Sequence, residues 1–528
     1  MPPKKRTTKG KGKSGDNSKK RKKRDSFSSS GDDFDSDSGA KGDGNHSVFK
    51  DNNGSNAHLD EDNGTDDVAL QPKLPELSGR LLVCGGTNWD LIGRKELPKA
   101  AKNAAQTAPG KNLWSPHKTP YRVRALVSSC TACHSMIITD EGKAMTWGRN
   151  DKGQLGHGDV KTRNEPTLVE GLSSHQIVGG AVGRSHTLFL TSKGQVFACG
   201  DNKMGQLGIG TQSQSVMVPS RVLYKGKPIV KMSCGAEFSM ILDAVGNLYS
   251  FGSPEYGQLG HNSEGKYFAS GNKLAYRCEL TPRKLVFFIE KTREGHILPL
   301  EDVSIEEVAC GVNHSLAVDR KKRCFSWGFG GYGRLGHTET KDELMPRNIK
   351  TFDSLNRGVK HIFCGGTFSM AIDENGLLYF WGQNKSSGEA TMYPKNVQDL
   401  NGWNVRAIGC ANKSIVVAAD ESLISWGPSP TYGELGYGEN KAKSSTTPQE
   451  VKPMEGIYTH RVTCGFAHTL IMARDDSDQD KETIDKLPKP MEGIYTHRVT
   501  CGFAHTLIMA RDDSDQDKET IDKLPVWP

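Results

Sequence analysis

One stretch decides the fold: Cys310-Gly-Val-Asn-His-Ser-Leu-Ala-Val-Asp-Arg-Lys-Lys-Arg-Cys-Phe-Ser-Trp-Gly328, followed by Phe329-Gly-Gly-Tyr-Gly-Arg-Leu-Gly336. Residues 315–319 are small and apolar, whereas residues 324–327 alternate and end on an aromatic side chain. A short polar segment separates the two runs. This pattern predicts a β-hairpin that leaves through a tight, glycine-rich exit loop.

The same unit occurs six times along the chain. The spacing between successive starts is 52, 52, 76, 54 and 45 residues. A unit of several strands repeated at such distances is typical of a propeller or an array. The histidine position of the unit is occupied by His134, His186, Phe238, His314, Phe368 and Lys413. A glycine after Trp, Cys or Phe follows fourteen residues later, at Gly148, Gly200, Gly252, Gly328, Gly382 and Gly427.

The two ends of the repeat region complement each other. A seventh start at His468 lacks the second strand, and Leu81-Leu-Val-Cys-Gly85 is a second strand that lacks a first. Pairing them would remove two exposed sheet edges. We therefore predict an all-β fold over residues 79–475, a seven-bladed β-propeller closed by its terminal strands. Its last blade would combine residues 79–86 with about 462–474.

The exit loops and the repeat strand resemble a known family. Gly153-Gln-Leu-Gly156 returns at 205–208, 257–260 and, with Arg for Gln, at 333–336. With the Cys-Gly-x-x-His-Ser/Thr-Leu strand and the Trp-Gly end, these loops resemble the regulator of chromosome condensation repeats. Residues 87–96, 326–336 and 425–430 resemble one member of that family in particular. The resemblance implies a seven-bladed propeller that docks small GTPases and chromatin. No inserted wedge like that of the family's Ran-exchanging founder is present, which leaves Ran exchange in doubt.

Composition limits the remaining possibilities. The chain has 528 residues, 35% of them hydrophobic, and 59 glycines. No run approaches the ~18 apolar residues of a membrane span, and the start Met-Pro-Pro-Lys-Lys-Arg lacks the apolar core of a signal peptide. We expect a soluble intracellular monomer whose 12 cysteines are free thiols. Cys130-Thr-Ala-Cys133-His134 matches a haem attachment pattern. The repeat register explains Cys130 and His134, so we predict no cofactor and no metal.

Residues 1–78 are predicted to be a disordered tail of two opposite charges. Residues 1–24 hold twelve Lys/Arg and one acid, and residues 25–67 hold twelve acids and two lysines. Such polar, aperiodic segments do not bury a core. The basic run predicts nuclear import and binding to polyanions such as DNA, chromatin and microtubules; the alternative is a solvated charge run without a receptor. The run consists of Lys19, Lys20, Arg21, Lys22, Lys23 and Arg24, and Ser28, Ser29 and Ser30 precede acids that suit an acid-directed kinase.

The tail and the resemblance together set the expected location. We predict a nuclear protein, present in the nucleolus, on chromosomes and centromeres, and at the spindle midzone in mitosis, with a cytoplasmic fraction. Cell-cycle progression is the expected setting. Phosphates on the three serines would deepen the acidic block and let it fold back on the basic one.

Two insertions interrupt the repeats. Residues 91–106 form a basic loop with a predicted short helix after Pro98, in which Lys95, Lys99 and Lys102 share a face and Arg94 is adjacent. This loop is either a contact for a small GTPase or a solubilising loop. The second insertion, with Lys284–Glu290 and His296–Leu300, predicts an extra hairpin that packs on a blade or on a partner.

Sequence motifs for covalent catalysis are missing from the chain. No nucleophile elbow, phosphate loop or zinc motif occurs, and histidines that repeat around a ring indicate structural hydrogen bonds. Guanine-nucleotide exchange needs only differential binding of a Rac, Ral or Arf type GTPase, and it remains open. The alternative is a scaffold that recruits chromatin, microtubule or mitotic proteins. Further candidate GTPase contacts in the exit loops are Glu255, Tyr256, Tyr332, Tyr432 and Glu434.

The C-terminus contains an unchanged duplication. Residues 452–488 return residue for residue as 489–525, whereas the other repeats share only key positions. Residues 476–488 are predicted to form a polar tail or a frayed helix, and residues 489–528 are a surplus copy with three terminal residues. Because seven units already close the ring, the surplus copy is expected to stay outside it, or to compete with the first copy for pairing with the strand at 81–85.

Overall fold

The computed structural model describes residues 68–94, 112–292, 294–354, 357–384, 389–429 and 431–488, and the strands 496–501 and 506–510. The chain divides into two units, Met1–Leu59 and Asp60–Pro528, and all described residues belong to the second. No helix in these ranges is long and apolar enough to cross a membrane.

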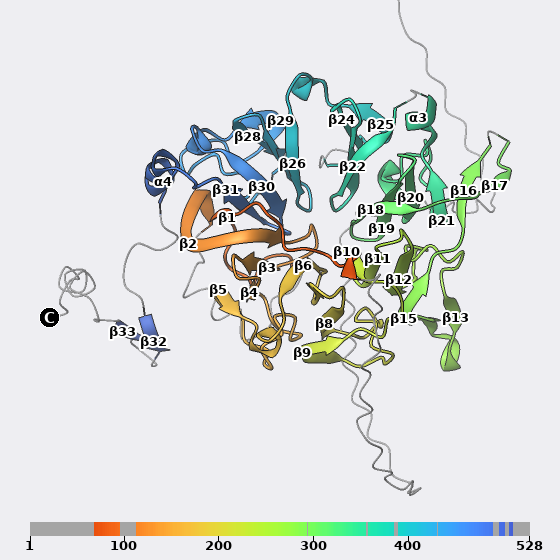
Figure 1. The fold of residues 1–528 in the computed structure, drawn as a ribbon, viewed down its shortest axis with the longest axis horizontal. Helices are drawn as coiled ribbons and strands as arrows, with labels where there is room; N and C mark the ends of the chain where they lie inside the picture. Colours follow the sequence, from red (N-terminus) through yellow and green to blue (C-terminus); the bar gives the residue numbers. More distant parts are fainter. Residues whose placement is uncertain are drawn as a thin grey trace, which may run out of the picture. The chain divides into compact units, whose positions relative to one another are not determined.

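Five separate sheets share one plan, in which consecutive strands pair antiparallel (Figure 1). The sequence predicted the hairpin and its glycine-rich exit loop from the repeat, and the prediction of an all-β propeller is confirmed. The strands are β6 (Ile177–Val182), β7 (His186–Thr191), β8 (Val196–Asp201) and β9 (Ser215–Arg221); β10 (Ile229–Cys234), β11 (Phe238–Asp243), β12 (Leu248–Gly252) and β15 (Glu279–Lys284); β18 (Ile305–Cys310), β19 (His314–Asp319), β20 (Cys324–Gly328) and β21 (Glu343–Asn348); β22 (Val359–Cys364), β23 (Phe368–Asp373), β24 (Leu378–Gly382) and β25 (Thr391–Asn396); and β26 (Val405–Cys410), β27 (Ile415–Ala419), β28 (Ser422–Gly427) and β29 (Ser445–Glu450).

The remaining propeller strands form one continuous seven-stranded sheet, in the order β30-β31-β1-β2-β3-β4-β5. The prediction of seven separate blades is therefore wrong, because the structure has five separate blades beside this sheet. The cause is β2, whose 15 residues pair with β1 along one part and with β3 along the other. The strands are β1 (Gly79–Gly85), β2 (Leu113–Val127), β3 (His134–Thr139), β4 (Ala144–Gly148), β5 (Arg163–Leu168), β30 (Thr459–Cys464) and β31 (His468–Ala473).

The terminal strands pair as the sequence predicted. β1 lies antiparallel to β31 from Arg80 opposite Ala473 to Gly85 opposite His468. Buried side chains on both strands, among them Leu82 and Ile471, form one apolar cluster with Ile484. β1 and β31 therefore each have a partner strand on both sides, so neither terminal strand is left as a free edge.

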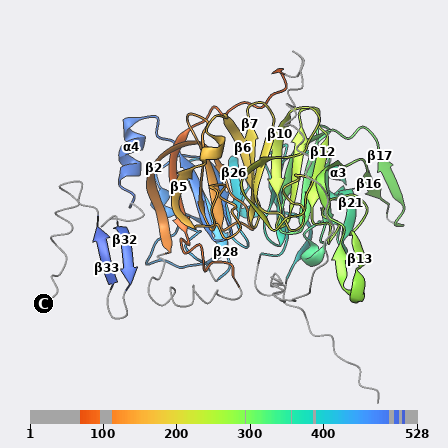
Figure 2. The same ribbon diagram turned by 90° about the horizontal axis from the view of Figure 1, so that it is seen from below.

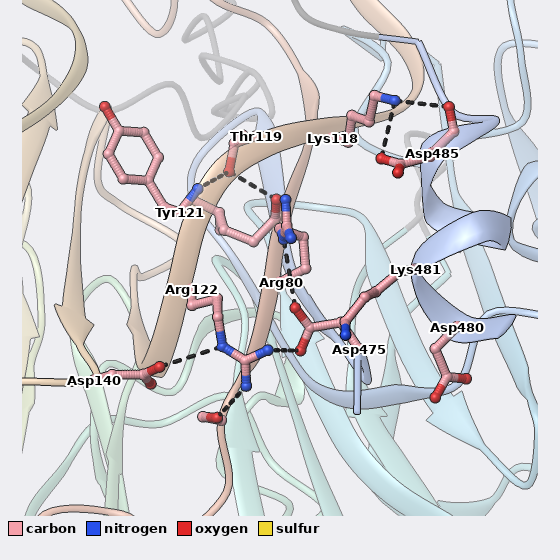
Figure 3. Close-up of polar contacts among 12 residues, drawn as sticks. Arg80, Lys118, Thr119, Tyr121, Arg122, Asp140, Asp475, Asp480, Lys481 and Asp485 are labelled. Carbon is pink, nitrogen blue, oxygen red and sulfur yellow. Dashed lines mark hydrogen bonds and ion pairs between the residues drawn. The ribbon is translucent and has the colours of Figure 1, made fainter. Parts of the chain in front are cut away.

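A buried carboxylate fastens this closure (Figure 3). Asp475, 1% exposed, lies 2.5 Å from Arg122 Nη1 and 3.5 Å from Arg80 Nε. Arg122 also reaches Asp140 at 3.3 Å. Helix α4 (Asp478–Asp485), with a capping box at its N-terminus, follows, and Lys118 Nζ donates to the Asp485 carbonyl at 2.7 Å. The segment after β31 is thus tied to both β1 and β2.

The repeat histidines connect neighbouring sheets. His186 Nε2 lies 2.9 Å from Ser239 Oγ, and that hydroxyl donates to the Gln206 carbonyl at 2.8 Å. Since the serine proton goes to the carbonyl, Nε2 must be the donor in this neutral ring. The predicted structural role of these histidines is confirmed. Equivalent contacts join His134 to Thr187 and His314 to Ser369 between sheets, and His468 of β31 to Ser135 of β3 within the seven-stranded sheet.

Gly183, three residues before His186, makes room for that ring. A Cβ on Gly183 would lie 2.1 Å from His186 Cε1, so a side chain there would have to move this ring. The first repeat differs, because Thr131 stands at the equivalent place before His134. In the sheet β26–β29, Ser414 occupies the position that the repeat histidine has in the other sheets. The predicted register with Lys413 is one residue off, because Cys410 pairs with Ile415 and the β27–β28 turn is one residue shorter.

The second insertion adds two hairpins outside the ring (Figures 1 and 2). The predicted one packs on a blade: Ile289 pairs with Arg347 of β21, which extends that sheet to six strands. The other forms a separate two-stranded sheet that was not predicted. Their strands are β16 (Phe288–Lys291), β17 (Ile297–Leu300), β13 (Lys266–Phe268) and β14 (Leu274–Tyr276).

The surplus copy forms a hairpin of its own, β32 (Thr496–Cys501) with β33 (Thr506–Ala510), in the same register as β30 with β31. It joins no other described sheet. The remaining elements are short: α3 (Lys350–Ser354), η1 (Glu170–Leu172), η2 (Ser270–Asn272), η3 (Gly331–Gly333), η4 (Gln398–Leu400) and η5 (Lys452–Met454).

Candidate docking surface on the exit loops

Five exit loops follow the same strand end and therefore share one end of the propeller, called here the exit-loop face. A hydroxyl on the preceding strand fixes each of four loops: Ser326 Oγ, for example, donates to the Leu335 carbonyl at 2.7 Å. Rigid strands thus position the loops, an arrangement suited to binding. The loops are 153–156, 205–208, 257–260, 333–336 and 433–436, and the other three hydroxyl bonds are made by Thr146, Ser250 and Ser425.

An acceptor side chain organises four of these turns. Gln154, Gln206 and Gln258 each accept a hydrogen bond from the backbone N–H two residues earlier, at 2.8–2.9 Å. Glu434 does the same with Tyr432 N at 2.6 Å, and it also accepts from Ser414 Oγ at 2.8 Å. Burial raises the pKa of this carboxyl. Glu434, a predicted GTPase contact, is 4% exposed and lies inside its turn.

Arg334 replaces that acceptor in the fifth loop. A guanidinium has no acceptor atom, and here the turn is built differently: Tyr332 adopts a left-handed backbone with φ 62°. Arg334 Nε donates to the Gly331 carbonyl at 2.9 Å and Nη1 to the Gly366 carbonyl at 3.1 Å. Burial lowers the pKa of the Arg334 guanidinium to about 10.

Aromatic rings surround this arginine. The guanidinium carbon lies 4.6 Å from the Phe329 ring centre and 5.6 Å from that of Tyr332. The Tyr256 ring is centred 5.0 Å from Phe329. All three rings are half-buried, so each keeps part of its surface open. We call Tyr256, Phe329, Tyr332 and Arg334 the aromatic–arginine cluster; it unites two predicted contacts, Tyr256 and Tyr332.

Glu255 links the exit-loop face to the unpredicted hairpin. It accepts a hydrogen bond from the Tyr276 hydroxyl at 3.1 Å, and Tyr276 ends β14. The hairpin presents large apolar side chains to solvent, with Phe268 76% exposed and Leu274 51% exposed. Exposed aromatic surface of this kind is a feature of protein-binding sites.

The segment after β1 forms a second anchored region. Arg149 Nε donates to the Trp89 carbonyl at 2.9 Å, and Ile92 packs with Tyr432 and Phe466. Arg94 Nη2 lies 2.7 Å from Asp151 Oδ2, so its charge is already paired. Arg94 therefore anchors the start of the predicted basic loop. The loop's other candidates, Lys95, Lys99 and Lys102, lie outside the described residues, as do Lys19–Arg24 and Ser28–Ser30.

Sequence reasoning missed Phe329 and Arg334. One signal was available for the arginine: three of the Gly-x-Leu-Gly loops carry Gln where this one carries Arg. Nothing in the sequence singled out Phe329, since its role depends on the ring of Tyr256 from another blade.

A central cavity of about 220 Å³ is lined by the innermost strands. Burial raises the pKa of Cys130, Cys310 and Cys464 to about 12, so these thiols stay protonated at neutral pH. A protonated thiol is neither a nucleophile nor a metal ligand. The described residues contain no group of three or more His, Cys, Asp or Glu placed to hold a metal. The cysteines lining the cavity are Cys130, Cys234, Cys310, Cys364, Cys410 and Cys464.

Comparisons with known proteins agree with this geometry. The profile of the RCC1-like domain matches residues 80–471. Protein RCC2 of Homo sapiens is 58% identical over 414 residues, which cover 78% of this chain and 79% of the relative. The Protein RCC2 homolog of Danio rerio is 56% identical over 429 residues, covering 80% and 86%. The crystal structure of Prp20p from Saccharomyces cerevisiae has a TM-score of 0.59 at 19% identity, covering 80% and 97%, which shows a shared fold.

Proposed function

The chain belongs to the RCC1-like domain family, as the repeats predicted, and from that premise we propose that it binds and regulates a small GTPase through the exit-loop face. The single observation that carries the proposal is the aromatic–arginine cluster on an RCC1-like propeller. Aromatic and arginine side chains are the residue types that dominate protein-binding hot spots.

A family argument supports the choice of partner. Prp20p, which shares the fold, is described with binding properties toward Gsp1p and histones. The resemblance found in the sequence implies that members of the family bind small GTPases and chromatin. Because this chain shares only 19% of its residues with Prp20p, the GTPase is proposed by class, with Rac, Ral and Arf types as candidates.

The proposed action is a change of nucleotide affinity. A protein that binds the empty GTPase more tightly than the loaded form accelerates nucleotide release by that difference alone. Such a role requires a binding surface held in a fixed shape, and the strands of the propeller hold the exit loops in this way. The exit loops would contact the GTPase directly, through the rings of Tyr256 and Tyr332.

The location follows from the charged tail. We propose that Lys19–Arg24 directs nuclear import and binds chromatin and DNA, since six adjacent cations attract phosphate backbones. Ser28–Ser30 would tune that affinity when phosphorylated. Nucleus, chromosomes and the mitotic spindle are the compartments where such a protein would act.

The alternative is a scaffold that recruits chromatin, microtubule or mitotic proteins without exchanging nucleotide. The exposed apolar side chains of the β13–β14 hairpin favour it, because they offer a second binding surface outside the exit loops. Nucleotide exchange would not need that surface.

The deciding experiment is release of a fluorescent GDP from Ran, Rac, Ral and Arf type GTPases by the full chain. Faster release from one member would establish exchange and name the substrate. Binding without faster release would favour the scaffold, and preference for the GTP form would favour an effector role. Failure of every GTPase to bind would refute the proposal.

A further inference from the structure

The β13–β14 hairpin carries positive charges that its surroundings leave uncompensated. Segment 265–277 contains Lys266, Lys273 and Arg277 and no acidic residue. Glu264, just before it, pairs with Lys266 at 2.8 Å. The side chains of Lys273 and Arg277 are exposed and make neither an ion pair nor a hydrogen bond with any described residue. Two open cations on one short ribbon favour an anionic partner.

The hairpin is held at its base and free at its tip. At the base, the Tyr276 hydroxyl donates to Glu255, and a Cβ on Gly265 would meet Pro254 Cγ at 2.6 Å. At the tip, Gly271 has a left-handed backbone with φ 77°, and a Cβ there would meet nothing within 4 Å. Figure 2 shows β13 at the outer edge of the propeller, projecting away from it. The outer part of the ribbon is therefore open to a partner.

The strand register sorts the side chains of the hairpin onto two faces. Phe268 lies opposite Leu274, and Tyr267 lies opposite Ala275. Backbone bonds from Ala269 to Lys273 and from Arg277 to Gly265 extend the ladder by one pair at each end. Because successive residues of a strand alternate between faces, one face carries Phe268 and Leu274, and the other carries Tyr267 with the two open cations.

The second face alternates cation, ring and cation. Lys273 and Arg277 are four strand residues apart, about 13 Å, and the Tyr267 ring stands between them, opposite the small side chain of Ala275. Tyr267 is 48% exposed, and Phe268 on the first face is 76% exposed. Both rings are therefore available for stacking, and the cations beside Tyr267 are available for phosphates.

This pattern selects one class of partner. Single-stranded nucleic acid is held by rings on which its bases stack and by cations that follow its backbone. A duplex keeps its bases paired and stacked on one another, so it could not use the rings. A membrane is less suitable, because the tip of the hairpin, Ser270-Gly271-Asn272, is polar. A protein partner would use the apolar side chains but would not need the two open cations.

We propose that the β13–β14 hairpin binds single-stranded nucleic acid. Tyr267 and Phe268 are the stacking rings, and Lys273 and Arg277 contact phosphates. This site goes beyond the proposed function, because it requires no GTPase. It also differs from the basic run Lys19–Arg24, which would attract any polyanion, whereas the rings select unpaired bases. RNA and DNA strands share this chemistry, and the experiment distinguishes them.

The test uses the full chain with Lys19–Arg24 changed to glutamine, so that the tail does not mask the hairpin. Fluorescence anisotropy at low salt measures binding of oligouridine, oligothymidine and a DNA duplex of equal length. We expect Tyr267→Ala and Phe268→Ala each to weaken binding of the single strands about tenfold. Tyr393→Ala is the matched control, because Tyr393 is a 50% exposed ring on β25, and it should change affinity by less than about twofold.

The salt dependence tests the cations separately. Changing Lys273 and Arg277 together to glutamine removes two phosphate contacts, which should lower the slope of log K against log salt by about 1.4. The charge-matched control changes Lys193 and Lys321, exposed lysines of two strand turns, and should keep the parent slope. All these side chains are exposed, so each melting temperature should stay within about 2 °C of the parent.

The ratio of oligouridine to oligothymidine affinity assigns the site to RNA or to DNA. Binding of single strands without binding of any GTPase would refute the proposed function and leave this site standing. The site is refuted if the tail-neutralised chain binds no single strand at low salt, if the duplex binds as tightly, or if the ring variants match Tyr393→Ala. Phosphatidylserine vesicles that bind through Phe268 while oligonucleotides do not would also refute it, and would assign the hairpin to a membrane surface.

Discussion

His468 and Ser135, which are 333 residues apart in the sequence, are joined by a hydrogen bond of 2.6 Å between Nε2 and Oγ. The bond repeats the one between His134 and Thr187, at 2.9 Å. The same contact that links neighbouring blades therefore also links the last strand of the ring to the first complete hairpin. The Trp89 ring packs edge-on against His468 at 5.0 Å and shields it from solvent.

These histidines should make the propeller sensitive to acid. Burial lowers the pKa of His186 to about 3 and that of His468 to about 4. In the unfolded chain a histidine has a pKa near 6.5, so below that pH the unfolded state gains a proton that the folded state refuses. The stabilising contribution of these histidines is complete above about pH 6.5. It is lost as the pH falls toward 4 for His468 and toward 3 for His186.

His186→Phe should flatten this acid response, because each such histidine costs about 1.4 kcal/mol of stability per pH unit in that window. Phe238 and Phe368 hold the same position in sister blades, and Ser239 keeps its bond to Gln206. We expect a change within about 1.5 kcal/mol at pH 7.5 and a gain over wild type at pH 5, measured by urea unfolding. Equal slopes with pH in the two proteins would contradict the assignment.

Asp475 should decide which copy of the duplicated segment closes the ring. Asp475→Asn removes the charge that faces Arg122 and Arg80, and we expect a loss of about 1–3 kcal/mol. Asp512 is the same residue in the surplus copy. Asp512→Asn should leave the free energy of unfolding unchanged, and it is a control with identical local sequence.

The same pair of variants reveals exchange between copies. If Asp475→Asn costs little while the double variant costs the full amount, the surplus copy has taken the place of the first. Limited proteolysis would then cut within 452–488 in Asp475→Asn and within 489–525 in the wild type.

Gly183 should tolerate no side chain. A Cβ there would sit 2.1 Å from His186 Cε1, so Gly183→Ala must displace the ring and break its bond with Ser239. We expect a loss of about 2 kcal/mol or more in thermal or urea unfolding. Gly179→Ala in the same blade is the matched control, because its nearest neighbour, Leu190 Cδ2, would be 3.4 Å away. Equal effects of the two changes would refute the packing argument.

A structural feature could be predicted from the sequence when it depends on the repeat itself, and not when it depends on contacts between distant segments. The pairing of Leu81–Gly85 with the strand of His468 was predictable, because a strand half without its partner can be recognised from the repeat alone. The continuous sheet was not, because the length of β2 depends on an insertion that carries no repeat signal. The predicted register of the repeat that starts at Lys413 is wrong by one residue, because the turn between β27 and β28 is one residue shorter than in the other repeats. The cluster around Arg334 could not be predicted, because two of its contacts, with Tyr256 and Gly366, come from other blades.

Tyr332 offers a test in which stability and binding should move in opposite directions. It is held at φ 62°, a conformation that costs a residue with a side chain about 1 kcal/mol. Tyr332→Gly relieves that cost and deletes the ring beside Arg334. We expect a melting temperature at or above wild type and an affinity for the nucleotide-free GTPase that falls about tenfold.

Lys322→Gly is the matched control for the backbone effect. Lys322 has φ 64° in the β19–β20 turn, where sister hairpins carry Gly142, Gly194, Gly246 and Gly376. Its ion pair with Glu306 is partly exposed and contributes little. This variant should gain the same backbone stability without losing GTPase affinity. If both variants bind like wild type, the ring of Tyr332 is not a contact and docking must use another part of the exit-loop face; if both lose affinity, the effect is on the fold.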